Sequence, residues 1–399
     1  MRSLRFVRLL AIVSVVAIVA AACGGEEAAG ERTVVSVWFQ GAMTGDYNYL
    51  VIPAFQGAQL RVTELNNEVG FPAAITLKQG DTQGDPANAP PVVDAVVSDP
   101  DTVAVVGPAF SGESEASGDT YNEAQIPFVT PSATNPGLAD KGWDYWYRGV
   151  ANAAGQGALA GQYLAQEIGA KSVFVSHDKG TYGQGLAEVV RDTLEQEGVK
   201  VAGFEGIETG ATDFSAFITD VQASGADSLF FGGYDADFGK IVKQIRDAGL
   251  DIELMSADGS TSITFLSLAG KAAEGTNLIC PCNLGGDFAT KYRGAYGGQI
   301  TAVPIYAAEG YDAMSVIGEG IRHAIDDGAT TAEDIRLGIK EYLDTLTPEN
   351  PFPGVAKPLG FDPDTHELAS DNPDSLYYFY KVEGGKITAL GNAPDVVGG

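Results

Sequence analysis

Residues 103–134 constrain this chain more than any other stretch. Two short apolar runs, VAVV and IPFV, enclose about one helix's worth of small and polar residues, which read GPAFSGESEASGDTYNEAQ. Two parallel strands of one sheet need a long crossover between them, and the crossover is usually a helix. The pattern therefore predicts a β-α-β unit.

Both apolar runs end in polar turn chemistry. Ser111 follows the first run where the next helix begins, and the second run leads into TPSAT, which contains Ser132, Ala133 and Thr134. Ligands of open α/β sheets bind outside the carboxyl ends of the strands, and a helix start offers free N–H groups to an anion. The stretch predicts half of a carboxylate site. The alternative is that Ser111 is an ordinary N-cap and the second loop an ordinary turn.

The same alternation of strands and helices begins again near residue 155 and continues to about residue 260. A chain of 399 residues is long enough for two or more domains. We therefore expect an α/β fold with two doubly wound lobes and a cleft between them. The tail adds a long helix over 304–325, another over 332–343 and a final strand over 376–382.

Residues 1–22 read as a signal peptide. Three arginines precede a nearly unbroken apolar run that is too short to span a membrane comfortably. The run ends in three alanines and Cys23, which resembles a bacterial lipobox and predicts a lipidated cysteine. Residues 23–32 are then a flexible tether. The alternative is a plain signal peptide cut nearby, and either interpretation places the mature chain outside the cytoplasm.

The charge excludes one class of partner. Residues 1–22 contain three arginines and no acidic residue, so the mature chain keeps 21 basic residues against 53 acidic ones, a net charge of −32. Nucleic acid is not expected as a partner, because neutralising its phosphates requires lysine and arginine.

With Cys23 acylated, the chain has two further cysteines, Cys280 and Cys282. The sequence favours a local disulfide or a pair of free thiols over metal or redox chemistry, because the three histidines are scattered along the chain. No metal, cofactor or catalytic group is predicted. His177 and Asp178 invite a hydrolase interpretation, but no G-x-S-x-G elbow accompanies them.

The chain resembles the type I periplasmic binding proteins that serve ABC importers, in particular the leucine/isoleucine/valine-binding branch. The similarity extends over about residues 33–382 and rests on eight stretches in the same order: GAMTG, GDTQGDP, VVGPAFS, IPFVTPSAT, YWYRGV, VSHDKGTYGQGLA, FGGYDADFGK and LMSADG.

The resemblance implies two Rossmann-like lobes joined by a three-strand hinge. The first lobe would contain residues 33–150 and 283–355, and the second residues 151–282 and 356–399. A disulfide found in part of the family cannot form here, because Gly84 and Phe110 stand at its two positions.

Several residues match positions at which the family contacts its ligand. Ser111 matches the serine that hydrogen-bonds the ligand's carboxylate, and Thr134 matches the threonine that contacts both carboxylate and ammonium. Ser132 falls where backbone groups are used, and Ala133 belongs to the same loop. The resemblance thus assigns the carboxylate side to the first lobe.

The second lobe would supply the ammonium side. Asp258 falls where the family often has a glutamate that pairs with the ammonium, and it is one methylene shorter. Tyr182 and Tyr234 match aromatic residues that close over the ligand. Leu50 falls where many members place an aromatic ring. The alternatives are that both tyrosines are rim residues and that Asp258 is an ordinary turn residue.

These residues suit an α-amino acid, which needs neutral donors for its anion and a buried carboxylate for its cation. The expected function is that of an extracytoplasmic receptor, not an enzyme, which binds an aliphatic amino acid and delivers it to ABC permease and ATPase subunits. A lipid anchor would hold it to the membrane. The alternatives are another small ligand, such as an amide, urea or another carboxylate, or a ligand sensor.

Overall fold

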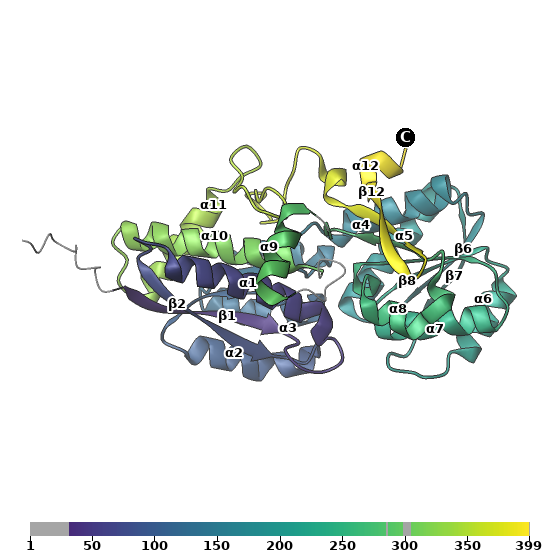
Figure 1. The fold of residues 1–399 in the computed structure, drawn as a ribbon, viewed down its shortest axis with the longest axis horizontal. Helices are drawn as coiled ribbons and strands as arrows, with labels where there is room; N and C mark the ends of the chain where they lie inside the picture. The colour runs from purple at the N-terminus through teal and green to yellow at the C-terminus, as the bar shows by residue number, and fades with distance from the viewer. Residues whose placement is uncertain (1–31, 285, 298–304, 399) are drawn as a thin grey trace, which may run out of the picture.

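The computed structural model describes residues 32–284, 286–297 and 305–398, and Figure 1 shows two lobes side by side. The predicted signal peptide and Cys23 lie outside the described residues, and so does the predicted tether apart from Arg32. Within the described ranges, no helix is both long enough and apolar enough to cross a membrane.

Each lobe is built on its own sheet. The first sheet has the strand order β2-β1-β3-β4-β5 and the second has the order β12-β11-β10-β9-β8-β6-β7. The strands of the first sheet are β1 (Thr33–Gly41), β2 (Ala73–Asp81), β3 (Thr102–Val106), β4 (Phe128–Thr130) and β5 (Trp146–Arg148). Those of the second are β6 (Ser172–His177), β7 (Lys200–Gly206), β8 (Ser228–Gly232), β9 (Glu253–Ala257), β10 (Asn277–Cys280), β11 (Tyr378–Glu383) and β12 (Lys386–Asn392).

Helices cover both faces of the first sheet. They are α1 (Asn48–Asn67), α2 (Ala89–Ser98), α3 (Ser111–Glu123), α10 (Ala307–Asp326) and α11 (Ala332–Asp344), and α9 (Gly286–Tyr296) packs on the outside of α1 and α10. Side chains of a strand alternate between its two faces. On β3, Ala104 and Val106 therefore belong to the core beneath α1 and α10, whereas Val105 joins the core beneath α2 and α3.

The second sheet is covered in the same way. Its helices are α4 (Ala153–Gln162), α5 (Thr181–Gln196), α6 (Ser215–Ser224), α7 (Asp235–Asp247), α8 (Ile263–Ala269) and the short α12 (Ala393–Val396). On β8, Phe230 packs into the core of α4 and α5, and the next residue, Phe231, stacks on Phe238 of α7 with 5.5 Å between ring centroids. Central strands such as β3 and β8 are buried on both faces, so they read as continuous apolar runs.

The chain passes between the two sheets after β5, after β10 and again before β11. The last passage runs beside β5, where the backbone N–H of Arg148 donates to the carbonyl of His366 (3.1 Å). Three passages lying together are what a hinge between two lobes requires. The residue limits assigned to each lobe stay a prediction.

The predicted α/β fold with two parallel-sheet lobes is confirmed, and three details of the elements differ. The strand expected to end the chain is followed by β12 and α12. β12 is an edge strand with side chains exposed on both faces, so its sequence carries no apolar alternation. The predicted start of the long helix at Pro304 lies outside the described residues, and α10 begins at Ala307. α4 begins two residues before the predicted start, where the Asn152 side chain accepts hydrogen bonds from two backbone N–H groups.

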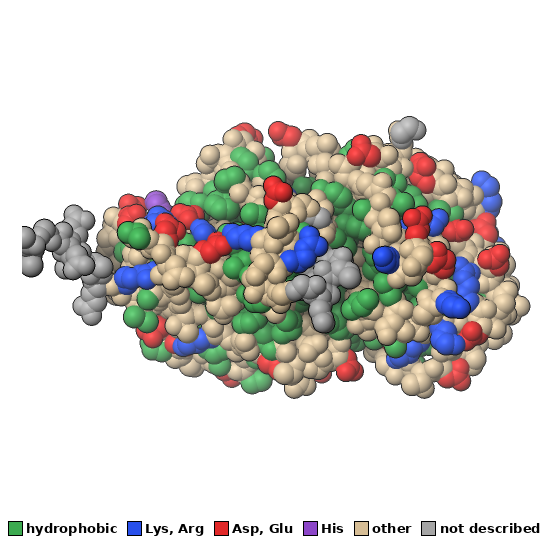
Figure 2. Space-filling model, viewed as in Figure 1, with side chains coloured by type: hydrophobic (Ala, Val, Ile, Leu, Met, Phe, Trp, Pro, Cys, Tyr) green, Lys and Arg blue, Asp and Glu red, His purple; other side chains and the backbone are tan. Residues whose placement is uncertain are grey.

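The excess of acidic residues is spread over the surface. On the face drawn in Figure 2, acidic side chains lie over both lobes and basic ones are interspersed among them. A distributed charge of this kind favours solubility and does not by itself mark a binding site.

Candidate functional site

A pocket lies between the lobes, at the carboxyl ends of strands from both sheets. Its empty volume, part of which opens to solvent, is about 340 Å³. It is lined by Leu50, Val51, Ala109, Phe110, Ser111, Ser132, Tyr182, Tyr234, Asp258, Gly259 and Tyr306. Six of the eight residues predicted to bind a ligand are in this lining, and Ala133 and Thr134 are not.

On the first-lobe side, Ser111 is the first residue of α3 and Phe110 is the N-cap. The interpretation of Ser111 as an ordinary N-cap is therefore wrong. Its hydroxyl oxygen accepts a hydrogen bond from the backbone N–H of Asn135 (3.1 Å), which ties the start of α3 to the loop after β4. Ser132 lies in that loop, and its hydroxyl donates to the carbonyl of Ala109 (2.7 Å). The hydroxyls of Ser111 and Ser132 thus join the segment that follows β3 to the loop that follows β4, beside the pocket.

Ala133 and Thr134 lie one step behind the lining. The N–H of Ala133 donates to the Thr130 hydroxyl (3.0 Å), and its carbonyl accepts from the guanidinium of Arg148. The Thr134 hydroxyl is buried and has no hydrogen-bond partner among the described residues. Since an unpaired buried hydroxyl costs free energy, it is an open position for a ligand or a water molecule.

Arg148 holds the loop that follows β4 in place. It is not among the predicted site residues. The side chain is fully buried, and its guanidinium also donates to the carbonyl of Asn135 (2.8 Å) and to both carboxylate oxygens of Glu367 (2.7 and 2.9 Å). The two carbonyls flank Thr134. A charged, planar donor group that holds both sides of Thr134 limits the movement of its hydroxyl.

On the second-lobe side, Asp258 is the buried carboxylate, with 4% of its surface exposed. It directly follows β9 and accepts hydrogen bonds from Gln156 Nε2 (2.6 Å), the Tyr182 hydroxyl (2.8 Å) and the Tyr306 hydroxyl (2.6 Å). Burial raises the pKa of Asp258, and the three hydrogen bonds oppose the rise. Neutral donors reduce the cost of burying the anion and leave its charge uncompensated.

Aromatic rings from both lobes cover the pocket. The ring of Tyr234 lies 5.3 Å from that of Tyr182 in the same lobe, 5.1 Å from Tyr47 and 5.6 Å from Phe110 across the cleft. Burial raises the pKa of Tyr234 well above its usual value. The rings and Leu50 give the pocket an apolar wall, as an aliphatic side chain of a ligand would need.

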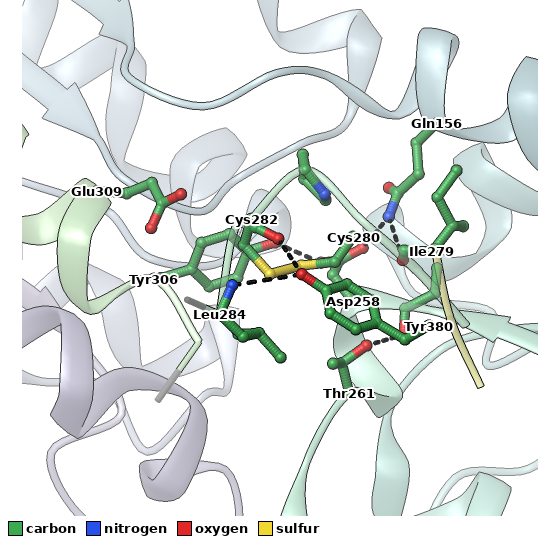
Figure 3. Close-up of a disulfide and its surroundings, with 12 residues drawn as sticks. Gln156, Asp258, Thr261, Ile279, Cys280, Cys282, Leu284, Tyr306, Glu309 and Tyr380 are labelled. Carbon is green, nitrogen blue, oxygen red and sulfur yellow. Dashed lines mark hydrogen bonds between the residues drawn. A yellow bond between two sulfur atoms is a disulfide. The ribbon is translucent and has the colours of Figure 1, made fainter. Parts of the chain in front are cut away.

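Cys280 and Cys282 form a disulfide at the end of β10, with 5.0 Å between their Cα atoms. Figure 3 shows it among Gln156, Asp258 and Tyr306. The link to the pocket is Gln156, whose side chain donates both to Asp258 and to the carbonyl of Ile279 (3.0 Å), the residue before Cys280. The cysteines therefore lie where the chain leaves the second sheet, next to the pocket.

Sequence reasoning missed Gln156, Tyr306 and Arg148. Gln156 lies on α4, where a glutamine among small residues gives no signal of a site. Tyr306 precedes a helix on another part of the chain. Arg148 stands in the quoted stretch YWYRGV, and an arginine at the end of a buried strand was a signal that it has a buried partner.

The pocket offers one position for an anion and a separate position for a cation. The first lobe offers hydroxyls and the start of a helix, which favour an anion, and the second offers a buried carboxylate, which favours a cation. Among the described residues, no group of three or more histidines, cysteines or acidic residues is placed to hold a metal ion.

Comparison with known proteins agrees with this architecture. A family model described as periplasmic binding protein matches residues 39–386. The leucine-, isoleucine-, valine-, threonine- and alanine-binding protein of Pseudomonas aeruginosa is 31% identical over 298 residues, which are 71% of this chain and 77% of that protein.

Solved structures share the fold. The leucine-binding protein LivK of Thermotoga maritima superposes with a TM-score of 0.79 at 22% identity, over 90% of this chain and 99% of that one. LivJ of Streptococcus pneumoniae, solved with isoleucine, gives 0.76 at 25% identity over 90% and 99%. The chain therefore belongs to the periplasmic binding protein family, and it is a non-enzymatic, extracytoplasmic solute-binding protein of the ABC-transporter type.

Proposed function

We propose that this protein binds an aliphatic α-amino acid, in particular leucine, isoleucine or valine, between its lobes and delivers it to an ABC importer. The observation that carries the proposal is the buried carboxylate of Asp258, which lies across one pocket from Ser111 at the start of α3. An α-amino acid carries its cation and its anion about 3 Å apart and satisfies both sides at once.

The remaining contacts follow from that placement. The ligand's carboxylate accepts hydrogen bonds from Ser111, from the backbone N–H of Ser132 and from the buried Thr134 hydroxyl. Its ammonium pairs with Asp258. Its side chain lies against Leu50 and the rings of Tyr182 and Tyr234, which gives an aliphatic group an apolar environment. The names of the Pseudomonas, Thermotoga and Streptococcus relatives support this class of ligand.

We further propose that Cys23 carries a lipid anchor and that residues 24–32 tether the lobes to the outer face of the cytoplasmic membrane. The support is the run of alanines directly before the cysteine. Mass spectrometry of the mature N-terminus tests it, since an acylated residue 23 is heavier than a free one.

Calorimetric titration of the mature chain tests the ligand. The protein is first unfolded and refolded to remove bound ligand, and is then titrated with the aliphatic amino acids, with simple amides and urea, and with plain carboxylic acids. We expect one molecule of leucine, isoleucine or valine to bind per chain. Binding only to amides or plain acids would contradict the proposal and leave the fold unaffected.

Asp258→Asn is the decisive variant, because it keeps the shape of the side chain and removes its charge. An unpaired buried charge costs about 3–5 kcal/mol, so we expect affinity for the amino acid to fall at least 100-fold. Asp178→Asn is the matched control. Asp178 is also buried in the second lobe, and it accepts a hydrogen bond from the backbone of Gly180 without lining the pocket.

A further inference from the structure

The three donors to Asp258 come from different lobes. Gln156 and Tyr182 belong to the second lobe and both donate to Oδ1 (2.6 and 2.8 Å). Tyr306 donates to Oδ2 (2.6 Å) and precedes α10, which packs on α1 of the first lobe. The Tyr306–Asp258 hydrogen bond therefore crosses the cleft and exists only while the lobes are closed.

The three donors also differ in how firmly they are held. Gln156 Nε2 donates to the carbonyl of Ile279 (3.0 Å), and the Tyr182 hydroxyl accepts from the N–H of Gly259 (3.2 Å). Both partners lie in the second lobe, so these two donors stay beside Asp258 whether the cleft is open or closed. Over the described residues, the Tyr306 hydroxyl makes one hydrogen bond, to Asp258. Since its partner lies in the other lobe, it is the donor that separates from Asp258 when the cleft opens.

Tyr306 is also held in an unusual backbone conformation. Its φ is 61°, in the left-handed region that a bulky residue rarely adopts and that costs free energy. The side chain is nonetheless buried in the pocket lining, with its hydroxyl on the carboxylate. The surrounding structure thus orients this ring toward Asp258.

We propose that the Tyr306 hydroxyl occupies, in the empty closed protein, the hydrogen-bonding position on Asp258 Oδ2 that the amino group of the ligand takes. Tyr306 is then a positioning residue, which holds the empty protein closed and modulates the affinity for the ligand. It offers a neutral hydroxyl to a buried carboxylate and yields to a ligand that brings a positive charge. This inference rests on the proposed function, because it requires a ligand with an amino group.

The competition affects ligands with and without an amino group differently. An ammonium forms a charge-paired hydrogen bond with Oδ2 and outcompetes a phenol, since such bonds are about twice as strong as neutral ones. A plain carboxylic acid of the same shape brings no donor, so it leaves the Tyr306–Asp258 bond in place and gains nothing at this position. Tyr306 therefore weakens the binding of a ligand that has an amino group and places no such cost on a ligand that lacks one.

Tyr306→Phe tests the proposal, because it removes one oxygen and keeps the ring. The loss of the hydroxyl removes the competitor, so we expect leucine to bind about threefold to tenfold more tightly than to the wild type, the range that the net contribution of an ordinary hydrogen bond permits. The affinity for 4-methylpentanoate, which is leucine without its amino group, is expected to stay the same or to fall. Calorimetry with both probes measures the two affinities.

Tyr182→Phe is the matched control. It removes a hydroxyl from the same carboxylate, but one that stays in place with and without ligand, so its hydrogen bond cancels in the affinity and we expect little change in leucine binding. Leucine affinity that is unchanged or reduced in Tyr306→Phe would overturn the proposal, because the Tyr306 hydrogen bond would then persist in the complex.

A measurement without ligand separates this inference from the proposed function. Small-angle X-ray scattering of the empty protein is expected to show a larger radius of gyration for Tyr306→Phe than for the wild type, and no change for Tyr182→Phe. An unchanged radius in Tyr306→Phe would overturn the inference on its own. If no amino acid binds to any variant, the proposed function fails, and with it the assignment of Oδ2 to an amino group, whatever the scattering shows.

Discussion

Glu113 shows how a single residue ties the pocket to the stability of the first lobe. It lies in the first turn of α3, two residues after Ser111, and is fully buried. Its carboxyl accepts hydrogen bonds from the Thr82 hydroxyl and from the backbone N–H of Phe110 (3.4 Å). Burial raises the pKa of Glu113 to about 7, against the stabilising effect of these donors.

The raised pKa of Glu113 determines whether the protein becomes more or less stable as the pH rises. The unfolded chain releases the Glu113 proton near its ordinary pKa of 4.5, whereas the folded protein holds it to about pH 7. The folded state is therefore favoured below pH 4.5, and this advantage is lost as the pH rises from 4.5 through 7. A shift of this size corresponds to about 3 kcal/mol.

Glu113→Gln should remove this loss. The amide of the variant is neutral at every pH, so its free energy of unfolding should fall less steeply between pH 5 and pH 8 than that of the wild type. At pH 8 the variant should be more stable than the wild type by up to about 3 kcal/mol. Urea unfolding at the two pH values measures the difference. Glu123→Gln, at the exposed end of α3, is the control. Equal pH dependence in wild type and Glu113→Gln would show that Glu113 is ionised throughout.

At this scale the sequence was informative where a polar residue directly follows a buried strand. Ser111 follows β3 by a short loop and Asp258 follows β9 immediately, and both line the pocket. Tyr306 could not be found in that way, because its place beside Asp258 depends on how α10 packs across the cleft. Local patterns predict which strand end a residue occupies, and they carry no signal of contacts between distant segments.

The end of β10 is the element in which the hinge and the pocket meet. Cys280 closes the strand, and the carbonyls of the next two residues are held by buried partners. The ammonium of Lys357 donates to Pro281 (2.6 Å), and the Tyr380 hydroxyl donates to Cys282 (2.8 Å). Lys357 also lies 3.4 Å from the buried carboxylate of Glu309 on α10. Three separate segments thus hold this passage between the lobes.

The disulfide is expected to contribute little to global stability. The loop it closes is only three residues long, and for such a loop the chain-entropy model gives about 1–2 kcal/mol. The double variant Cys280→Ser, Cys282→Ser should therefore lose about that much free energy of unfolding and should still bind ligand, because the contacts of Lys357 and Tyr380 remain. Urea unfolding and calorimetry measure both properties. A loss above about 4 kcal/mol would mean that the bridge determines the conformation of this passage.

The sequence predicted the elements better than it predicted their edges. Strands such as β3 and β8 are buried on both faces and appear as apolar runs, so their positions agree with the structure within a few residues. β12 was missed because it is an exposed edge strand whose pairing with β11 depends on the turn at Gly384 and Gly385. The disulfide remained one of two alternatives, because a sequence shows two cysteines and not their oxidation state.

On the scale of the whole molecule, the two lobes contact each other directly across the pocket. Asn135 Nδ2 donates to the carbonyl of Thr181 (2.6 Å), and the Thr181 hydroxyl donates to Glu115 (3.2 Å). The ring of Tyr47 in the first lobe packs against Tyr234 in the second (5.1 Å). The structure is thus a closed form, and these contacts belong to the equilibrium between open and closed states that a ligand shifts.

Tyr47 and Tyr306 both stabilise closure, but they should affect binding in opposite directions. The Tyr47–Tyr234 contact does not involve Asp258, so it persists when a ligand is bound, whereas the Tyr306 hydrogen bond gives way to the ligand. A contact present in both closed forms contributes to affinity, and one present only in the empty closed form opposes it.

Tyr47→Leu should therefore open the empty protein and weaken binding. The centroid of the Tyr47 ring lies 5.1 Å from that of Tyr234 and 6.2 Å from that of Phe110. Such aromatic pairs contribute about 0.5–1.5 kcal/mol each. Because one of the two pairs crosses the cleft, we expect a larger radius of gyration without ligand and a loss of affinity for leucine of up to about tenfold. Tyr47→Phe keeps the ring and should behave as the wild type. If Tyr47→Leu bound leucine more tightly, as expected for Tyr306→Phe, the Tyr47 contact would have to break on binding, and the closed form with ligand would differ from the one described.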